Sequence, residues 1–324
     1  MKKRQLGKTN MYINPIGLGC MGFSHAYGVA KDKEISIQTI RKAYELGYDF
    51  FDTAECYTGE NADGTISYNE EIVGEALKDV RNKVVIATKF GVEHKGDHLK
   101  LDLSPQKIRQ SIEGSLKKLQ TDYIDLYYQH RIDPHVEPET VAAVMKELMA
   151  EGKIKAWGIS EANEDYLRRA HAVCPVTAIQ NRYSMMATWH ENLFNVCKEL
   201  GITYVAFSPM ANGLLSGKFT PQSHFENGDF RNNMPQYKEK GYKKAKKLLD
   251  LLEMLSNNKN CTMAQLSLAW MLCKEDFIVP IPGSRKIERL EENFLAKDVE
   301  LTGEEIQEID ALLNSIDFDV FGGH

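Results

Sequence analysis

Four residues with acid–base side chains stand at or near the ends of short apolar runs. The run YDFFD ends in Asp52, Tyr57 lies five residues further on, VVIATK ends in Lys89, and IDLYYQH ends in His130. A phenol has an ordinary pKa of about 10, and a neighbouring ammonium lowers that pKa because it favours the phenolate. We therefore expect Lys89 to make Tyr57 a better general acid, with Asp52 as the counter-ion of the lysine. An imidazole at position 130 can donate a hydrogen bond to an oxygen that gains negative charge.

Each of these residues alone has an ordinary structural explanation, such as a turn, a solvated lysine or a buried histidine. Their common position at strand ends argues for a site, because the carboxyl ends of all strands meet on one face of a (β/α)₈ barrel. Three further apolar runs also end in polar residues, which are Ser160, Gln180 and Ser208. The sequence therefore predicts a proton-transfer site at the mouth of a barrel.

The pattern of apolar runs supports this fold. Eight runs read as strands, near 16–20, 48–52, 83–89, 124–130, 154–160, 178–183, 202–208 and 278–282. Helical patterns separate them, at 33–46, 68–78, 104–119, 138–150, 164–171, 190–200, 240–258, 262–273 and 287–296. Strands that alternate with helices and are buried on both faces are typical of a parallel barrel. We thus predict an α/β fold, a (β/α)₈ TIM barrel spanning residues 1–324 as one domain.

Signals at the element ends refine this prediction. The segment RQLGKTNMYINP reads as an N-terminal hairpin that plugs the closed end, and 303–314 reads as an extra C-terminal helix. Ser104 before Pro105 is typical of a helix start. Ser67 with Glu70 fits the capping-box pattern.

Length and composition exclude several classes of protein. The chain has 324 residues, 43% of them hydrophobic, and a net charge of −6. Apolar runs fall short of the roughly 18 residues of a membrane span, and no basic face for nucleic acid is evident. The six cysteines form no CxxC pair, so we expect free thiols, no metal site and a cytoplasmic protein. The oligomeric state stays open.

One motif points to a different fold. Gly17, Gly19 and Gly22 match G-x-G-x-x-G, the dinucleotide fingerprint. A true fingerprint opens directly into a helix and is followed about 20 residues later by an acid. Here no helical pattern follows, and Asp52 is the next acid at a strand end. We expect these glycines to keep the first strand end thin so that a ligand can lie above it.

The long connection at 209–239 is unusual for a compact barrel. Loops of this length are usually functional or disordered, and we expect this one to be a lid. Aromatic residues near the expected mouth, Phe23, Tyr27 and Trp189, suggest an apolar lining, although core packing explains them equally well.

The segments FDTAECY, IATKFG, LYYQHRID, GIS, IQNRYS, FSPM and IPGSRKIERLEEN occur in an order that resembles the aldo-keto reductase superfamily, in its bacterial and plant branch. The resemblance implies hydride transfer from a nicotinamide to an aldehyde or ketone, a small-molecule carbonyl substrate. Tyr57 would protonate the carbonyl oxygen, Lys89 and Asp52 would tune Tyr57, and His130 would orient the carbonyl.

The resemblance also implies a binding site for NADPH. Ser160 and Gln180 would hold the nicotinamide amide, Phe207 would pack against its ring, and the pyrophosphate would lie along Ser208 and the segment 214–218, which contains Leu214, Gly217 and Lys218. Ser284, Arg285 and Arg289 would surround the adenosine ribose, with Glu292 and Asn293 near the adenine. Two guanidiniums suit a 2′-phosphate.

Two positions depart from the usual pattern of this superfamily. Glu161 stands where many relatives have asparagine, and Gly283 stands where many have lysine. Two other functions remain open at this point: a regulatory protein that binds the cofactor as a sensor, and a Schiff-base lyase with Lys89 as nucleophile.

Overall fold

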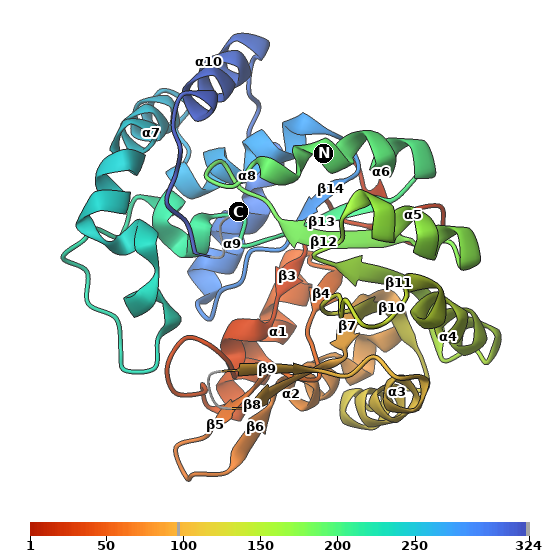
Figure 1. Ribbon diagram of the computed structural model, residues 1–324. Coiled ribbons are helices and arrows are strands. Elements are labelled where there is room, and N and C mark those ends of the chain that lie inside the picture. Colours follow the sequence, from red (N-terminus) through yellow and green to blue (C-terminus); the bar gives the residue numbers. More distant parts are fainter. Residues whose placement is uncertain (96–97, 322–324) are drawn as a thin grey trace.

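The structure, a computed structural model, describes residues 1–95 and 98–321 and contains an eight-stranded parallel sheet that closes into a barrel (Figure 1). The strands lie in sequence order, β3 (Leu18–Gly19), β4 (Phe50–Asp52), β7 (Val85–Phe90), β10 (Ile124–Gln129), β11 (Ile154–Ser160), β12 (Ala178–Arg182), β13 (Thr203–Phe207) and β14 (Ile278–Pro280). Backbone hydrogen bonds close the seam between first and last strands, from Gly17 N to Pro280 O at 3.0 Å and from Gly19 N to Pro282 O at 3.3 Å. The predicted (β/α)₈ fold is confirmed.

Helices surround the barrel as the sequence predicts. They are α1 (Lys33–Leu46), α2 (Asn69–Leu77), α3 (Pro105–Leu119), α4 (Pro138–Ala150), α5 (Glu164–Val173), α6 (Phe194–Leu200), α8 (Met263–Lys274) and α9 (Ile287–Leu295), with α7 (Glu239–Asn258) ahead of α8 and α10 (Gly303–Asn314) after α9. The Ser104 side chain caps α3 by accepting from Lys107 N. Gly47 and Gly201 end α1 and α6 in the left-handed conformation that glycine adopts most readily.

The N-terminal hairpin closes the amino end of the barrel. It pairs β1 (Arg4–Gln5) with β2 (Tyr12–Ile13). Leu6 and Ile13 are fully buried and pack in one cluster with inward residues of the strands, including Phe50 and Leu126. A second and larger cluster lies between the strands and the helices. The barrel interior is therefore a packed core, and only its carboxyl end is available for a site.

Two hairpins rise from the loops at the carboxyl end and were not predicted. They are β5 (Thr58–Glu60) with β6 (Ile66–Tyr68), and β8 (Val92–Lys95) with β9 (His98–Leu101). The first hairpin shows that the predicted capping box of Ser67 and Glu70 is wrong. Ser67 lies in β6, α2 begins after Tyr68 without a side-chain cap, and the Glu70 carboxylate instead accepts from Thr88 Oγ1 at 2.7 Å.

Close packing against neighbouring strands explains two glycines of the G-x-G-x-x-G motif. A Cβ on Gly17 would lie 2.6 Å from Phe50 Cδ1, and one on Gly19 would lie 2.8 Å from Ile281 O. A Cβ on Gly283 would lie 2.8 Å from Gly19 O. Gly19 and Gly283 thus allow the seam of the barrel to close, and the ligand clearance that we expected above these glycines stays a prediction.

The connection after β13 is compact rather than extended. It forms three 3₁₀ turns, η4 (Ala211–Ser216), η5 (Phe230–Asn233) and η6 (Pro235–Tyr237). The rings of Phe219, Phe225 and Tyr237 pack together within it. Whether this connection acts as a lid stays a prediction. Among the helices in the described ranges, none has the length and apolar composition to span a membrane.

Candidate active site

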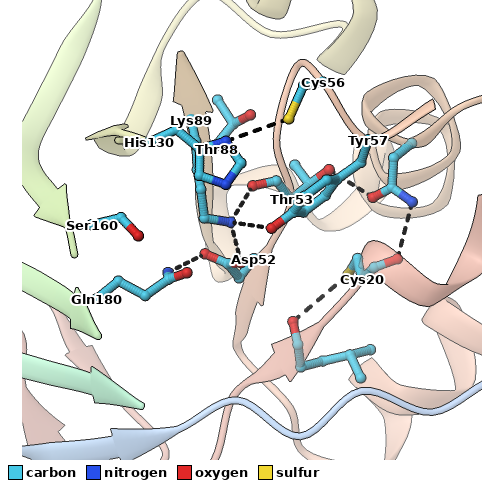
Figure 2. Close-up of polar contacts among 12 residues, drawn as sticks. Cys20, Asp52, Thr53, Cys56, Tyr57, Thr88, Lys89, His130, Ser160 and Gln180 are labelled. Atoms are coloured by element: carbon cyan, nitrogen blue, oxygen red, sulfur yellow. Dashed lines mark hydrogen bonds and ion pairs between the residues drawn. The ribbon is translucent and has the colours of Figure 1, made fainter. Parts of the chain in front are cut away.

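The four residues expected to transfer protons come together at the carboxyl end of three neighbouring strands (Figure 2). Asp52 ends β4, Lys89 lies in β7, and His130 directly follows β10. The Lys89 ammonium bonds Asp52 Oδ1 at 2.5 Å, Thr53 O at 2.8 Å and the Tyr57 hydroxyl at 3.2 Å. All three N–H groups of the ammonium therefore donate a hydrogen bond. The third of these bonds holds the Tyr57 phenol next to the Lys89–Asp52 ion pair.

Burial sets the charge state of this group. Lys89 is fully buried, which alone lowers the pKa of an ammonium, but Asp52 and Tyr57 outweigh burial and raise the pKa of Lys89 above its ordinary value. Burial also raises the pKa of Tyr57, and the Lys89 ammonium opposes this rise. We expected the lysine to lower the phenol pKa below its ordinary value. The lysine acts in that direction, but the loss of water around the phenol is the larger effect.

His130 lies on the other side of the phenol. Its ring meets the Tyr57 ring edge-on, with centroids 5.7 Å apart. Burial, followed by the charges of Lys89 and Arg131, lowers the pKa of His130 well below its ordinary value, so the imidazole is neutral. Its Nδ1 lies 3.4 Å from the Cys56 sulfur, and burial raises the pKa of that thiol to about 12.

A chain of hydrogen bonds that the sequence analysis missed ends at the backbone of Tyr57 and helps to hold that residue in place. Thr53 Oγ1 donates to Asn69 Oδ1 at 2.7 Å, and Asn69 Nδ2 donates to Ser24 Oγ at 2.8 Å. Ser24 Oγ in turn donates to the Tyr57 carbonyl at 3.1 Å. These residues come from three separate segments, around Ser24, Thr53 to Tyr57 and Asn69, so neither a motif nor periodicity could have identified their contacts.

The residues expected to hold a nicotinamide lie beside this centre. Ser160 and Gln180 are paired across β11 and β12, and both are buried. Gln180 Nε2 donates to Asp52 Oδ2 at 2.7 Å, a contact that the sequence did not indicate and that fixes the second carboxylate oxygen. Phe207 ends β13 and lies half-buried at the mouth. Arg182 places its guanidinium 5.0 Å from the centre of that ring.

Glu161, the unexpected acid after Ser160, has a left-handed backbone with φ of 58°. Its N–H donates to Gln180 O, which ties the end of β11 to β12. One oxygen of its carboxylate, Oε1, is buried and has no hydrogen-bond partner within the described part of the chain.

The expected pyrophosphate segment follows β13. Ser208, Ala211 and Asn212 have positive φ values of 51°, 47° and 59°, so the backbone turns sharply here. The Leu214 side chain is fully buried in the core, and Gly217 packs tightly, since a Cβ there would lie 2.3 Å from Met263 Sδ. Any ligand contact at these two positions must therefore come from backbone atoms.

The expected adenosine residues lie at the start of α9 and around it. The Arg289 guanidinium bonds Glu292 Oε2 at 2.5 Å, and Lys218 Nζ lies 3.6 Å from the same oxygen. Ser284 Oγ accepts from Lys286 N at 3.2 Å. Asn293 is almost entirely buried, whereas Arg285 has no ion-pair partner among the described residues. Glu292 therefore links the β13 loop to α9.

Two other expectations have a clear outcome. Phe23 is 1% exposed and belongs to the core, so it does not line the mouth. Tyr27 contacts the β13 loop, because Asn212 Nδ2 donates to its hydroxyl at 3.4 Å. No cluster of three or more His, Cys, Asp or Glu residues suited to a metal ion occurs in the parts of the chain that the structure covers.

Comparisons with known proteins agree with this geometry. The sequence profile of the aldo/keto reductase family matches residues 15–314. A probable aldo-keto reductase 1 from Glycine max is 39% identical over 308 residues, which cover 94% of this chain and 87% of the soybean protein.

Two solved structures are also similar. An aldo/keto reductase from Klebsiella pneumoniae in complex with NADP and acetate has a TM-score of 0.72 and 26% identity over 97% of this chain and 96% of that one. A glycerol dehydrogenase from Gluconobacter oxydans has a TM-score of 0.87 over 100% of this chain and 98% of that one. At 23% identity the latter supports the fold alone.

Proposed function

Because the chain belongs to the aldo/keto reductase family of NAD(P)H-dependent oxidoreductases, we propose that it reduces an aldehyde or a ketone to the alcohol with NADPH. The observation that carries this proposal is the Lys89 ammonium, bonded at once to Asp52 and to the Tyr57 hydroxyl. Bound NADPH would supply the hydride that adds to the carbonyl carbon. The residues of this chain would bind and orient the carbonyl and deliver the proton.

Tyr57 is the proposed proton donor. Burial raises its pKa, so the phenol keeps its proton at neutral pH and is ready to give it to a carbonyl oxygen. The phenolate left behind faces the Lys89 ammonium, 3.2 Å away, which stabilises the new negative charge. Asp52 and Thr53 hold the ammonium in place, and Gln180 holds Asp52.

His130 is proposed to hold the carbonyl oxygen through Nε2. The imidazole is neutral and carries a single proton, while the Cys56 thiol keeps its own because its pKa is raised. If Cys56 Sγ–H donates to Nδ1, the imidazole proton is on Nε2. We propose this tautomer because an Nε2–H group donates to the oxygen that gains negative charge during hydride transfer.

The residues around β13 and α9 fit the phosphate groups of NADPH. The turn at 208–213 holds three non-glycine residues at positive φ, a strained backbone of the kind found at ligand sites. Lys218 and Arg289 share the single carboxylate of Glu292, so one positive charge is unmatched there, and Arg285 adds another. We propose that Arg285 and Arg289 bind the 2′-phosphate, Ser160 and Gln180 the nicotinamide amide, and Phe207 the ring face.

The structure disfavours one of the alternative functions. A Schiff-base lysine must lose its proton to attack a carbonyl. The pKa of Lys89 is raised and its three donor positions are occupied, so it is a poor nucleophile. The six cysteines are free, which fits the cytoplasmic location that we propose.

A panel of aldehydes, ketones and sugars, assayed with NADPH and NADH by nicotinamide absorbance, tests the proposal. We expect turnover of at least one aldehyde, with NADPH preferred. Tight NADPH binding without turnover of any carbonyl compound would instead favour a regulatory protein. Borohydride trapping of a carbonyl compound on Lys89 would favour the lyase.

A further inference from the structure

Two arginines at the mouth of the barrel have no role in the function proposed above. Arg131 directly follows His130 after β10, and Arg182 is the last residue of β12, two positions after Gln180. Both are half-buried. They extend from strands on either side of β11, so they lie beside the proposed carbonyl site rather than out on the helices.

Neither arginine has an ion-pair partner within the described residues. Arg131 donates to the His130 carbonyl at 2.7 Å and to Ser160 Oγ at 3.3 Å, both uncharged acceptors. Arg182 contacts two aromatic rings, with its guanidinium carbon 5.0 Å from the centre of Phe207 and 6.0 Å from that of Phe321. None of the hydrogen bonds found in residues 1–95 and 98–321 uses its guanidinium as donor.

Four other half-buried arginines of this chain direct their guanidiniums at protein acceptors. Arg4 and Arg41 donate to backbone carbonyls of neighbouring elements, and two more are paired with an aspartate. Arg81 lies 2.6 Å from Asp125, and Arg231 lies 2.6 Å from Asp229. A partly buried guanidinium costs free energy unless it is paired, so pairing is the usual arrangement.

Among the described residues, Arg285 is also half-buried without an ion pair, and it lies at the proposed phosphate site. Arg131 and Arg182 likewise lack an acidic partner, and both lie at the expected substrate entrance. Guanidiniums without an acidic partner at a substrate entrance are expected where an anionic ligand binds.

The charges around the two arginines leave one positive charge unmatched. Burial lowers the pKa of Arg182 below its ordinary value, Glu161 at the end of β11 between the two arginines opposes this, and Arg131 adds to it. The nearby histidines, His94 and His190, have lowered pKa values because of burial and are neutral. Two guanidiniums and one carboxylate give a net charge of about +1, which a single carboxylate would neutralise.

We propose that Arg131 and Arg182 form a subsite for the carboxylate of the substrate, so that the favoured substrates are aldehydes or ketones that carry a carboxylate. The planar fork of a guanidinium matches a carboxylate in two hydrogen bonds. Arg131 follows the histidine proposed to hold the carbonyl, so the subsite lies next to the proposed carbonyl site. The proposed cofactor phosphates lie elsewhere, along the β13 loop and α9. This inference rests on the proposed reductase activity.

A matched pair of substrates isolates the subsite. 4-Carboxybenzaldehyde and 4-formylbenzamide have nearly the same shape and differ in charge, and both are assayed for kcat and KM with NADPH. A charge-assisted hydrogen bond contributes roughly 1.5–3 kcal/mol, which corresponds to roughly 10- to 150-fold. We expect Arg131→Gln and Arg182→Gln each to lower kcat/KM for the carboxylate at least tenfold, mainly through KM, and for the amide less than threefold.

Controls separate binding from structure. Glu161→Gln removes the competing negative charge and should raise kcat/KM for the carboxylate alone. Arg169→Gln, on an exposed arginine that pairs with Glu137 and Glu139, should change neither substrate. Equal losses for both substrates in the Arg131 and Arg182 variants would show a structural role and overturn the subsite. So would a weaker NADPH dissociation constant in the Arg182 variant, because that arginine would then belong to the cofactor site.

Two further measurements complete the test. Glyceraldehyde 3-phosphate against glyceraldehyde asks whether the anion is a phosphate, and a stronger arginine dependence for that pair would overturn the carboxylate assignment. Calorimetric binding of benzoate against benzamide to the NADPH complex does not need turnover, and equal benzoate affinity in wild type and both variants would also overturn it. If no carbonyl compound of the panel is reduced, the proposed reductase function fails, whereas a panel aldehyde reduced without either benzaldehyde being reduced or benzoate being bound overturns the subsite alone. If the amide is reduced without any preference for the carboxylate, the subsite alone fails.

Discussion

The proton-transfer centre and the proposed adenosine site are built in opposite ways. In the centre, Asp52 and Lys89 lie within strands, are almost fully buried, and direct every charged atom at a partner in another strand or loop. At the adenosine site, Arg289 lies on a helix and Arg285 just before it, both partly exposed to solvent, and the ion pair of Arg289 is with Glu292, three residues along the same helix. The sheet preorganises the first region, whereas in the second Arg289 would have to leave Glu292 to bind the proposed phosphate.

This difference has a physical origin. Parallel strands fix the relative height of their residues through the backbone ladder, so Asp52 pairs with Ala87 and Tyr128 pairs with Lys89 regardless of surface loops. Electrostatic stabilisation of a developing charge requires groups that need no rearrangement. Cofactor binding tolerates rearrangement, because its free energy is spread over many contacts. The predictions below follow from this contrast.

Removal of the proton donor should have the largest effect. Tyr57→Phe retains the ring and its packing but loses the proton. General acids contribute roughly 10²- to 10⁴-fold, and we expect a loss of that order in kcat with NADPH affinity unchanged. Steady-state kinetics with fluorescence titration of NADPH measures both. Activity within about threefold of wild type would remove Tyr57 from the mechanism.

The Lys89 variant should both slow the reaction and shift its pH dependence. Reduction requires a protonated phenol, so kcat/KM falls as the pH rises through the pKa of Tyr57. Lys89 lowers that pKa against the effect of burial. Lys89→Met should therefore reduce kcat by about 10²-fold and move the alkaline limb of the pH profile to higher pH. Asp52→Asn should do less because the lysine remains, and an unshifted limb in Lys89→Met would refute the tuning.

At the adenosine site, we expect smaller losses that depend on the cofactor. Arg285→Ala and Arg289→Ala should weaken NADPH binding by about 10- to 150-fold and leave NADH nearly unaffected, since NADH lacks the phosphate. The larger loss should come from Arg285, because Arg289 must first leave Glu292. Rising salt should reduce the preference for NADPH. Equal losses for both dinucleotides would mean that the arginines are structural.

The same contrast explains how far the sequence could be interpreted. Strand ends are visible as apolar runs that stop at a polar residue, so the fold, the order of the helices and the meeting of Asp52, Lys89 and His130 could be predicted. The contacts that complete the centre could not, since 128 positions separate Gln180 from Asp52 and 33 positions separate Ser24 from Tyr57. The two hairpins were also missed, because their short polar strands resemble loops.

We expect the smallest effect at Cys56. Its substitution tests whether the protein fixes the position of the imidazole proton of His130. Its thiol lies 3.4 Å from His130 Nδ1 and is proposed to keep the imidazole proton on Nε2. A neutral hydrogen bond contributes about 0.5–1.5 kcal/mol, so Cys56→Ala should lower kcat/KM roughly 2- to 13-fold. Cys56→Ser retains a donor and should recover most of the activity, with thermal unfolding as the check on packing. An alanine variant that matches wild type, or a serine variant no better than alanine, would show that the thiol only fills space and that Nε2 carries its proton without help.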